Sequence, residues 1–487
     1  MCGIFGIIGR SGNNLKLLKL MSKVQEFRGP DKKYFYTNKK KKIFLGTNRL
    51  SVIDIKRGHQ PMMSDNKNFL VTFNGAIYNF RKIKEYLIKK KISFKTNCDT
   101  EVIANAYQYW GSKAFNYFDG MWAICIYDIK KSEIILSRDY VGQKPLYYTF
   151  NNNYLLFSSQ IKGLLVDKNI PVKICDNSIS EYFQYSFIPA PKTLLKNIFQ
   201  LNPGSFLTYK ILTKKFKKKT YWDLKNGPDY NIFFNKSSEN EFIDMFKKVI
   251  DEHSISDVEP SVLLSSGLDS YLVAKFLSLY KKKITTFSLG FSNKTFNETD
   301  VVKKIKDNFK KNIFYLRKKR SLNILYKIRK KIDTPIGDSS LIPTYEIFSH
   351  VKKFSKVSLG GDGGDESFFG YITFDAFYIA SKLKKIFPNF VFSILNNLLN
   401  YLTVSYNYSN TNISQKLKKF FENIIDKHEH VLPGWMNSLS YMELQSLMKN
   451  KIYKKQIYLN SNKVFDKKKP YMRNAQTYYF KYYLPLI

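Results

Sequence analysis

The sequence is poor in cysteine and contains no long apolar run. Only four cysteines occur in 487 residues, which excludes a fold held together by disulfide bonds, and no Cys/His pair has the spacing of a zinc site. The most apolar stretch, 387–404, is interrupted by Pro388 and four asparagines, whereas a membrane-spanning helix needs about 20 mostly apolar residues. We therefore expect a buried helix there. The first residues show no signal-peptide pattern, so we expect a cytoplasmic protein without membrane contact.

Acidic residues are also scarce. There are 39 Asp and Glu against 80 Lys and Arg, which gives a net charge of +41 at pH 7. Such an excess is typical of proteins that bind nucleic acid or anionic membranes. Lysine is spread along the whole chain, however, and 40 Phe and 35 Tyr stand beside only four Trp, a bias expected of AT-rich coding DNA. We expect no nucleic-acid partner, and a basic nucleic-acid-binding protein stays as the alternative from another functional class.

The length and the hydrophobic pattern predict a globular chain of several domains. At about 150 residues per domain, 487 residues correspond to two to four domains. In the first 210 residues, short strands mix with helices. The apolar run 121–127 predicts a strand covered on both faces, and 146–150 with 154–157 predict a hairpin. Residues 211–240 are rich in Lys, Asn and Ser and lack periodicity, so we interpret them as a linker.

The second half has a different order of predicted elements. Predicted strands alternate with predicted helices, which favours a doubly wound parallel sheet. Ligands bind such folds at the carboxyl ends of the strands. The strands are expected at 261–264, 284–289, 312–315 and 356–359.

The amino terminus offers a candidate nucleophile. If Met1 is removed, the Cys2 thiol lies beside a free α-amine, whose ordinary pKa of about 7.7–8.0 suits a base. A cysteine at position two says little by itself. Here it is followed by several short polar motifs, which are Arg28-Gly29-Pro30-Asp31, Arg49–Asp54, Asn74–Asn79, Cys98–Glu101 and Arg138–Tyr148.

In this order the motifs resemble those of the class II glutamine amidotransferases, and most of all those of the asparagine synthetases. The resemblance implies an amino-terminal αββα Ntn-hydrolase sandwich over 1–210. It also implies that Cys2 attacks the side-chain amide of glutamine. The Asn74 amide and the Gly75 N–H would then stabilise the oxyanion of the tetrahedral intermediate.

The same resemblance assigns the glutamine-binding residues. Arg49 would hold the α-carboxylate by a bidentate pair, Asp99 would hold the α-ammonium, and Leu50, Asn74 and Gly75 would complete the pocket. Two positions depart from the family pattern: Ala76 replaces the usual Glu, and Phe27 replaces the usual His before Arg-Gly-Pro-Asp. The first change predicts weaker glutamine binding that depends on Asp99.

The segment 261–270 predicts an anion site, because an apolar strand runs through a Ser/Gly turn into a helix. It lacks the Gly-Lys-Ser/Thr ending of a P-loop. It resembles the pyrophosphate loop of enzymes that cleave ATP between the α and β phosphates. That family usually has Gly at Ser266, where a positive φ would cost Ser ~1 kcal/mol. The expected ATP and pyrophosphate-binding residues are Leu264, Ser265, Ser266, Gly267, Leu268, Asp269, Ser270, Gly360 and Gly361.

A second loop, Gly360–Glu366, is rich in Gly and Asp and leads to Tyr371. A calcium site is the alternative, but the 12-residue EF-hand spacing is absent. By resemblance this is the second active-site loop of the asparagine synthetases, in an ATP-pyrophosphatase-like domain over 241–487. Asp269 and Asp365 would hold Mg²⁺, Asp362 would lie beside the acyl-adenylate, and Tyr371 would close the site.

Together these motifs predict a glutamine-hydrolysing asparagine synthetase that uses ATP and Mg²⁺, with glutamine, aspartate and ATP as its small-molecule substrates. Family members continue past 483–487 and carry a late Lys at the ATP phosphate, so we expect a shortened synthetase domain. A different carboxylate acceptor, such as a surface-sugar precursor, and a glutaminase remnant with an inactive synthetase half stay open. A homodimer is also left open.

Overall fold

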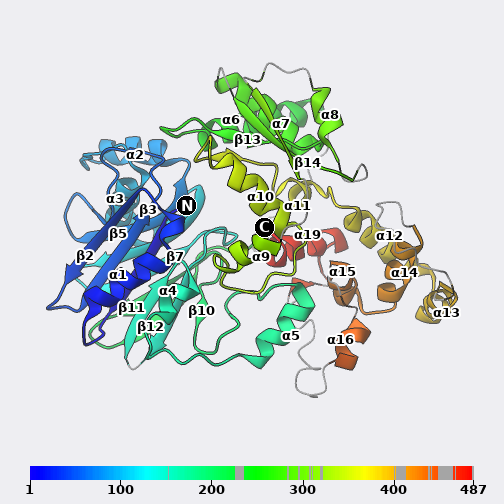
Figure 1. The fold of residues 1–487 in the computed structure, drawn as a ribbon, viewed down its shortest axis with the longest axis horizontal. Coiled ribbons are helices and arrows are strands. Elements are labelled where there is room, and N and C mark those ends of the chain that lie inside the picture. The colour runs from blue at the N-terminus through cyan, green and yellow to red at the C-terminus, as the bar shows by residue number, and fades with distance from the viewer. Residues whose placement is uncertain are drawn as a thin grey trace.

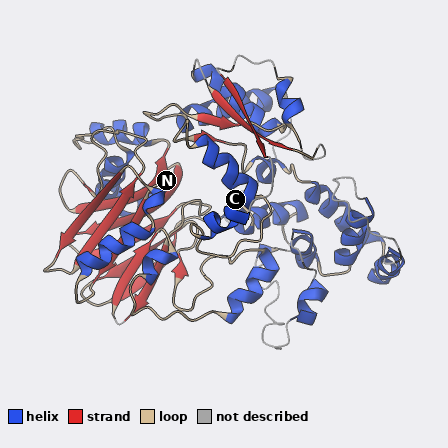
Figure 2. Cartoon of the chain, viewed as in Figure 1, coloured by secondary structure: helices blue, strands red, loops and turns tan. Residues whose placement is uncertain are grey.

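The computed structural model (Figures 1 and 2) describes the chain apart from a set of short segments, which are 152, 225–234, 282–283, 294–296, 306–308, 310, 318–321, 400, 402–412, 437–438, 440, 448–463, 467 and 485–487. The last residues of the sequence, on which the expectation of a shortened domain depended, therefore lie outside the described residues.

The first half is a sandwich of two antiparallel six-stranded sheets (Figure 2). One sheet has the order β10-β8-β9-β1-β3-β2, formed by β1 (Gly3–Ile8), β2 (Lys32–Asn38), β3 (Ile43–Arg49), β8 (Tyr147–Asn151), β9 (Tyr154–Ser158) and β10 (Phe199–Gln200). The other has the order β12-β11-β7-β6-β5-β4, formed by β4 (Met62–Met63), β5 (Phe69–Ile77), β6 (Gly120–Asp128), β7 (Glu133–Arg138), β11 (Ser205–Lys210) and β12 (Lys215–Thr220).

Helices cover both outer faces of the sandwich. They are α1 (Asn14–Val24) and α4 (Ile161–Leu165) on the first sheet, and α2 (Phe80–Lys89) and α3 (Asp99–Trp110) on the second, with the short 3₁₀ segments Glu26–Arg28 and Gly111–Asn116. Along β6, Ile124 packs towards α3 while Tyr127 packs between the sheets. This alternation explains the apolar run 121–127 and confirms the predicted αββα sandwich.

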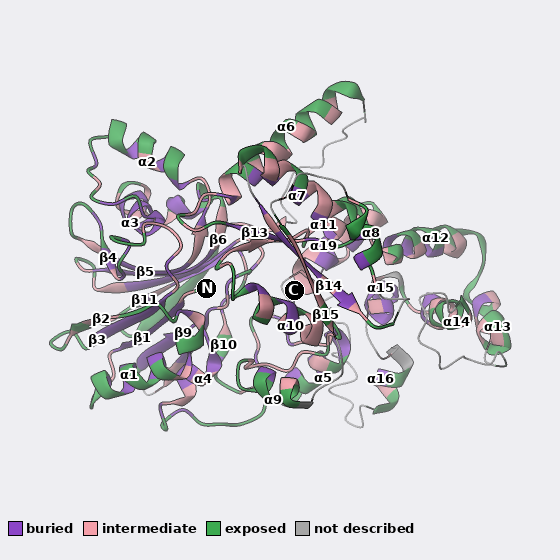
Figure 3. Ribbon diagram, turned by 45° about the horizontal axis from the view of Figure 1, so that its top comes forward, coloured by how far each residue is buried: buried purple, intermediate pink, exposed green. Residues whose placement is uncertain are grey.

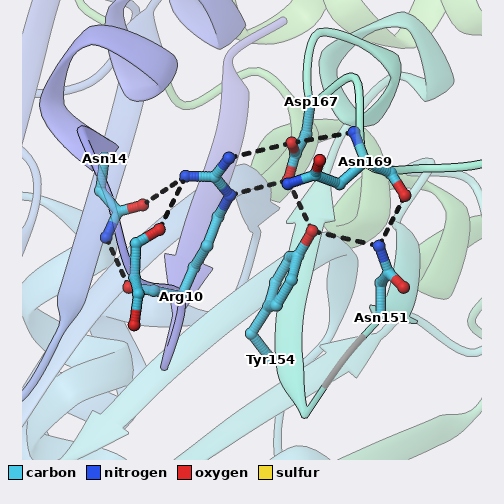
Figure 4. Close-up of polar contacts among 7 residues, drawn as sticks. Arg10, Asn14, Asn151, Tyr154, Asp167 and Asn169 are labelled. Carbon is cyan, nitrogen blue, oxygen red and sulfur yellow. Dashed lines mark hydrogen bonds and ion pairs between the residues drawn. The ribbon is translucent and has the colours of Figure 1, made fainter.

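A polar network fixes the end of β1 that lies away from Cys2 (Figure 4). Arg10 donates from Nε and Nη2 to the two carboxylate oxygens of Asp167, at 2.9 and 3.1 Å. The Tyr154 hydroxyl donates to the same carboxylate at 2.7 Å. Such a bidentate pair is geometrically specific, so it ties β1 to β9 and to the segment after α4.

Residues 211–240 do not form one unstructured connection. Strand β12 pairs along its whole length with β11, and α6 (Lys236–His253) begins before residue 240. The sequence hid β12 because all six of its residues are exposed, so no face shows apolar alternation. Its lysines lie at a sheet edge, where they oppose pairing with other chains. Residues 225–234 of the expected linker lie outside the described residues.

The second half contains a parallel sheet of order β15-β14-β13-β16, formed by β13 (Ser261–Leu263), β14 (Thr285–Phe291), β15 (Lys311–Arg317) and β16 (Ser358–Leu359). Helices α6, α7 (Leu268–Tyr280) and α8 (Thr299–Lys303) pack on one face. Helix α10 (Leu341–Val351) packs on the other, where Ile347 meets Phe287, and α9 (Leu322–Arg329) precedes it. Helices on both faces confirm the doubly wound parallel sheet.

The remaining helices form a separate cluster around Phe374, Trp435 and Tyr478, which α5 joins through Tyr185. Its elements are α5 (Asp176–Tyr185), α11 (Gly364–Phe368), α12 (Ile372–Ile386), α13 (Asn389–Leu399), α14 (Ile413–Ile424), α15 (His428–Met436), α16 (Tyr441–Leu447) and α19 (Tyr471–Tyr482).

The buried helix predicted within 387–404 is wrong in part. A helix forms there, α13, but of its side chains only Phe392 is buried, whereas Phe390, Ile394 and Leu398 are exposed. Apolar content alone did not reveal that, among the described residues, only the face of α13 that carries Phe392 packs against a partner. Among the described residues, no helix has both the length and the apolar character needed to cross a bilayer.

Candidate active sites

Cys2 lies at the start of β1, against the residue that follows β3. Its sulfur accepts a hydrogen bond from the Leu50 N–H at 3.4 Å, and Arg28 donates from Nε to the Cys2 carbonyl at 3.2 Å. Burial raises the pKa of the thiol. Burial, helped by Arg28 and Lys144, lowers the pKa of the terminal amine, here on Met1, to about 5. An amine that is neutral at pH 7 can accept a thiol proton.

Arg49, at the end of β3, is held by the backbone that follows it. Its guanidinium donates to the carbonyls of Ile53 and Asp54, both at 2.9 Å, and of Ile55 at 3.2 Å. A Cβ at Gly58 would lie 2.4 Å from Nη2 of Arg49, so glycine is needed for this close approach. The cation is therefore fixed in place and keeps two of its five N–H donors for a ligand.

Asp99 is buried at the start of α3. Its carboxylate accepts a 3.4 Å hydrogen bond from the Ile77 N–H. Burial raises the pKa of Asp99 to about 6, against the lowering effect of its hydrogen bonds and of Arg49. A buried carboxylate with so little compensation is suited to a cationic ligand.

Asn74 and Gly75 lie side by side on β5. The Asn74 side chain is fully buried, and neither Oδ1 nor Nδ2 has a hydrogen-bond partner among the described residues. An unsatisfied buried amide is costly and calls for an explanation, such as a missing ligand. A Cβ at Gly75 would lie 1.9 Å from the Met121 carbonyl oxygen, so only glycine fits here.

The structure adds two residues that sequence reasoning named only as parts of motifs. Arg28 is half-buried beside Cys2, and its buried Nη2 has no hydrogen-bond partner among the described residues. Lys144 is also buried, and its Nζ lies 3.2 Å from the Met1 sulfur. Burial lowers the pKa of Lys144 to about 8. Both are basic side chains withdrawn from solvent near Cys2, Lys144 fully and Arg28 in part, and this cannot be seen without the fold.

A second pocket, of roughly 640 Å³, lies at the carboxyl ends of β13, β14 and β16, where ligands of parallel sheets bind. Of the nine residues expected at ATP, all line this pocket except Ser266. The Ser266 N–H donates instead to the Glu298 carboxylate at 3.0 Å. Ser266 does not adopt a positive φ, so the serine carries none of the strain considered for it.

Glycines let the two carboxylates of this pocket pack closely against the backbone of the second loop and the residues after it. A Cβ at Gly364 would lie 2.2 Å from an Asp269 carboxylate oxygen, and one at Gly370 would lie 2.0 Å from an Asp365 carboxylate oxygen. Burial, and then the negative charge of Asp365, raise the pKa of Asp269. Two adjacent carboxylates are hard-oxygen donors of the kind Mg²⁺ prefers. No group of three or more acidic, His or Cys ligands occurs within the described part of the chain.

Asp362 and Tyr371 line the same pocket. Burial raises the pKa of Asp362. The Tyr371 hydroxyl donates to Glu366 at 2.9 Å, and its ring stacks on Tyr479 of α19. Both residues predicted at the acyl-adenylate therefore line the pocket that also contains the turn 265–270, and α19 packs against Tyr371.

Comparison with known proteins assigns a family to each half. A glutamine amidotransferase domain model matches residues 1–222, and an asparagine synthase model matches residues 241–464. A putative glutamine-hydrolysing asparagine synthetase 2 of Methanocaldococcus jannaschii is 36% identical over 420 residues, which is 80% of this chain and 79% of that protein. The glutamine-hydrolysing asparagine synthetase 1 of Bacillus subtilis is 30% identical over 385 residues, 76% of this chain but 59% of that protein.

A solved structure is also similar to part of the chain. It is a B. subtilis glutamine phosphoribosylpyrophosphate amidotransferase in complex with ADP and GMP. The match covers 67% of this chain and 70% of that one, with 16% identity and a TM-score of 0.34. A likeness of that size says nothing about the function of this chain.

Proposed function

The chain belongs to the glutamine-hydrolysing asparagine synthetase family, and on that premise we propose that it converts glutamine, aspartate, ATP and water to glutamate, asparagine, AMP and pyrophosphate. The synthetase activity is supported chiefly by the pocket in which Asp269 and Asp365 pack against Gly364 and Gly370. The glutaminase half is supported by the unpartnered Asn74 amide in the same domain as Cys2.

In the glutaminase half, removal of Met1 frees the α-amine of Cys2. The Cys2 sulfur then attacks the side-chain carbonyl carbon of glutamine after passing its proton to that amine. Asn74 and the Gly75 N–H receive the negative charge that develops on the carbonyl oxygen. The C–N bond then breaks, the amine returns the proton to the leaving ammonia, and water hydrolyses the thioester to glutamate. Arg49 and Asp99 hold the two charged groups of the substrate.

We expect Asn74→Ala to lower the kcat of glutamine hydrolysis by about 10²–10³-fold, the usual cost of one oxyanion donor. Because the amide has no hydrogen-bond partner in the part of the chain that the structure describes, its loss should not lower the thermal unfolding temperature. Steady-state kinetics and a thermal melt check both. Ammonia-dependent asparagine formation is the internal control and should be unchanged; a lower melting temperature with normal kcat would assign Asn74 to the core instead.

Asp99 gives a pH prediction. Its pKa is about 6, and only the ionised form attracts the ammonium of glutamine. The KM for glutamine should therefore be about tenfold higher at pH 5 than at pH 8, since one pH unit below a pKa leaves about a tenth of the acid ionised. Asp99→Asn should raise KM at all pH values and flatten this dependence. A wild-type KM that is equal at both pH values would exclude the role.

In the synthetase half, ATP phosphates would lie at the turn 265–270, where α7 begins. Asp269 and Asp365 fit Mg²⁺, which when bound neutralises charge on the pyrophosphate. Asp362 and Tyr371 face the same cavity and would flank the activated aspartate. Oxygen of the aspartate β-carboxylate forms a bond to the α-phosphorus of ATP, pyrophosphate leaves, and ammonia later displaces AMP.

Product analysis tests the whole proposal. With glutamine, Mg·ATP and aspartate, we expect glutamate, asparagine, AMP and pyrophosphate in equal amounts. AMP formation that needs a different carboxylate would support another acceptor. Glutamate release without any aspartate-dependent pyrophosphate would support a glutaminase remnant, and neither outcome is compatible with asparagine synthesis.

We also propose the division of the chain. The pairing of β12 with β11 extends the glutaminase domain to at least Thr220, and the synthetase domain starts with α6.

A cytoplasmic location is supported by the four cysteines, all of which are unpaired, because disulfides are rare in reducing compartments.

A further inference from the structure

The segment that shapes the proposed glutamine site is docked onto the other domain. Asp257, in the loop before β13, donates from its backbone N–H to the Val52 carbonyl at 2.9 Å. Its carboxylate accepts from the Ile55 N–H at 3.2 Å. Arg49 is held by the carbonyls of residues 53–55, so one aspartate of the synthetase domain supports the loop that fixes the glutamine-binding arginine.

A second contact reaches the residues next to the nucleophile. The Asp31 N–H donates to the Arg49 carbonyl at 3.1 Å, and the Asp31 carboxylate accepts from the Ser51 N–H at 2.8 Å. These bonds bracket Leu50, whose N–H contacts the Cys2 sulfur. The same carboxylate oxygen accepts from Lys356 of the synthetase domain at 2.7 Å.

Asp257 and Lys356 lie just before two neighbouring strands, in segments that we call the strand entrances. Asp257 precedes β13, which is labelled in Figure 3, and Lys356 precedes β16; the two strands pair in parallel. The entrances are joined, because the Ser261 N–H donates to the Val357 carbonyl at 2.9 Å. At their other ends, β13 leads into 265–270 and β16 leads into 360–365. Each strand is only two or three residues long, so little backbone separates the docking contacts from the ATP loops.

We propose that Asp257 and the Asp31–Lys356 ion pair are positioning contacts that couple the glutamine site to the ATP site through β13 and β16. A ligand that orders the ATP loops restricts the residues just before β13 and β16. Because these residues hold the segment 49–55, the same ligand favours glutamine binding. The inference rests on the proposed function, because it requires both sites to bind their substrates. By thermodynamic linkage, glutamine binding must raise the affinity for ATP by the same factor by which ATP binding raises the affinity for glutamine.

The contacts suit a coupling role because they are at the surface. Lys356 keeps 42% of its side chain exposed and Asp31 keeps 24%, and exposed ion pairs contribute little to folding. Their loss should therefore leave both domains folded. The chain also provides a matched control: Lys82 and Glu252 form another ion pair between the same domains, but they lie on α2 and α6, away from the strand entrances.

The experiment measures two quantities on the full chain of the wild type, Lys356→Met, Asp257→Ala, Lys356→Arg and Lys82→Met. One is the glutaminase kcat/KM with and without Mg·ATP plus aspartate. The other is the Kd of ATP before and after a diazoketone glutamine analogue has alkylated Cys2. In the wild type we expect each ligand to strengthen the other by at least about fivefold.

In Lys356→Met and Asp257→Ala that factor should fall to near one, with the thermal unfolding temperature close to wild type in both. In Lys356→Met the glutaminase kcat/KM without ATP should also stay close to wild type, because within the described part of the chain the Lys356 ammonium contacts only the Asp31 carboxylate. Lys356→Arg should restore it, and Lys82→Met should keep it. A wild-type factor of one, retention of the factor in both test variants, or its equal loss in Lys82→Met would overturn the proposal. Failure of the proposed function is a separate result, because it shows as absence of aspartate-dependent AMP while glutaminase activity and ATP binding are still measurable.

Discussion

Cys2→Ala should abolish glutamine hydrolysis and glutamine-dependent asparagine formation, while ammonia-dependent asparagine formation continues at the wild-type rate. The thiol is the proposed nucleophile, and the α-amine beside it has no thiol proton to accept once the sulfur is removed. Loss of a nucleophile typically lowers kcat by on the order of 10⁴–10⁶-fold. The expected result is therefore glutamate release at or near background.

The measurement is glutamate and asparagine production with glutamine or with ammonium chloride as the nitrogen source. Cys175→Ala is the matched control, since Cys175 is also half-buried and unpaired but caps α5 and takes no part in the proposed site. Equal loss of the ammonia-dependent reaction in Cys2→Ala would mean that the variant has damaged the fold. Residual glutaminase activity near the wild-type level would remove Cys2 from the mechanism.

The features predicted best from the sequence are those whose backbone shape and polar groups both come from neighbouring residues. The turn 265–270 follows a strand and opens a helix, so its amide groups and its position at the sheet edge are readable from neighbouring residues. The hairpin predicted at 146–150 and 154–157 corresponds to β8 and β9 within one residue at each end. In these places the period of the apolar residues and the turn residues agree.

What the sequence could not reveal depends on burial and on distant partners. Strand β12 has no apolar face, so its sequence is indistinguishable from that of a linker. Asp31 and Lys356 are separated by 325 positions, and nothing local in either segment indicates that they meet. The unpartnered state of the Asn74 amide appears only when the walls around β5 are in place. The sequence places Ser266 with its neighbours in the predicted ATP-binding turn, but its N–H donates to Glu298.

Asp269→Asn and Asp365→Asn should each lower asparagine and pyrophosphate formation by on the order of 10³-fold, whichever nitrogen source is used, and should leave glutamine hydrolysis intact. Removing one charged ligand of a metal that balances phosphate charge costs several kcal/mol. Asn keeps the shape that packs against Gly364 or Gly370, so the loss is one of charge. Raising the Mg²⁺ concentration should recover part of the activity if binding of the ion is what has weakened.

The same substitutions should not destabilise the protein, and this separates function from structure. The negative charge of Asp365 raises the pKa of Asp269, so the two carboxylates repel each other when both are ionised and no cation lies between them. Neutralising one removes that repulsion, and the melting temperature without Mg²⁺ should stay level or rise. Asp375→Asn on α12, an exposed position outside the pocket, removes the same charge and should change neither property. A lower melting temperature together with lost synthesis would indicate that the carboxylates hold the loops together, and the proposed metal pair would then be wrong.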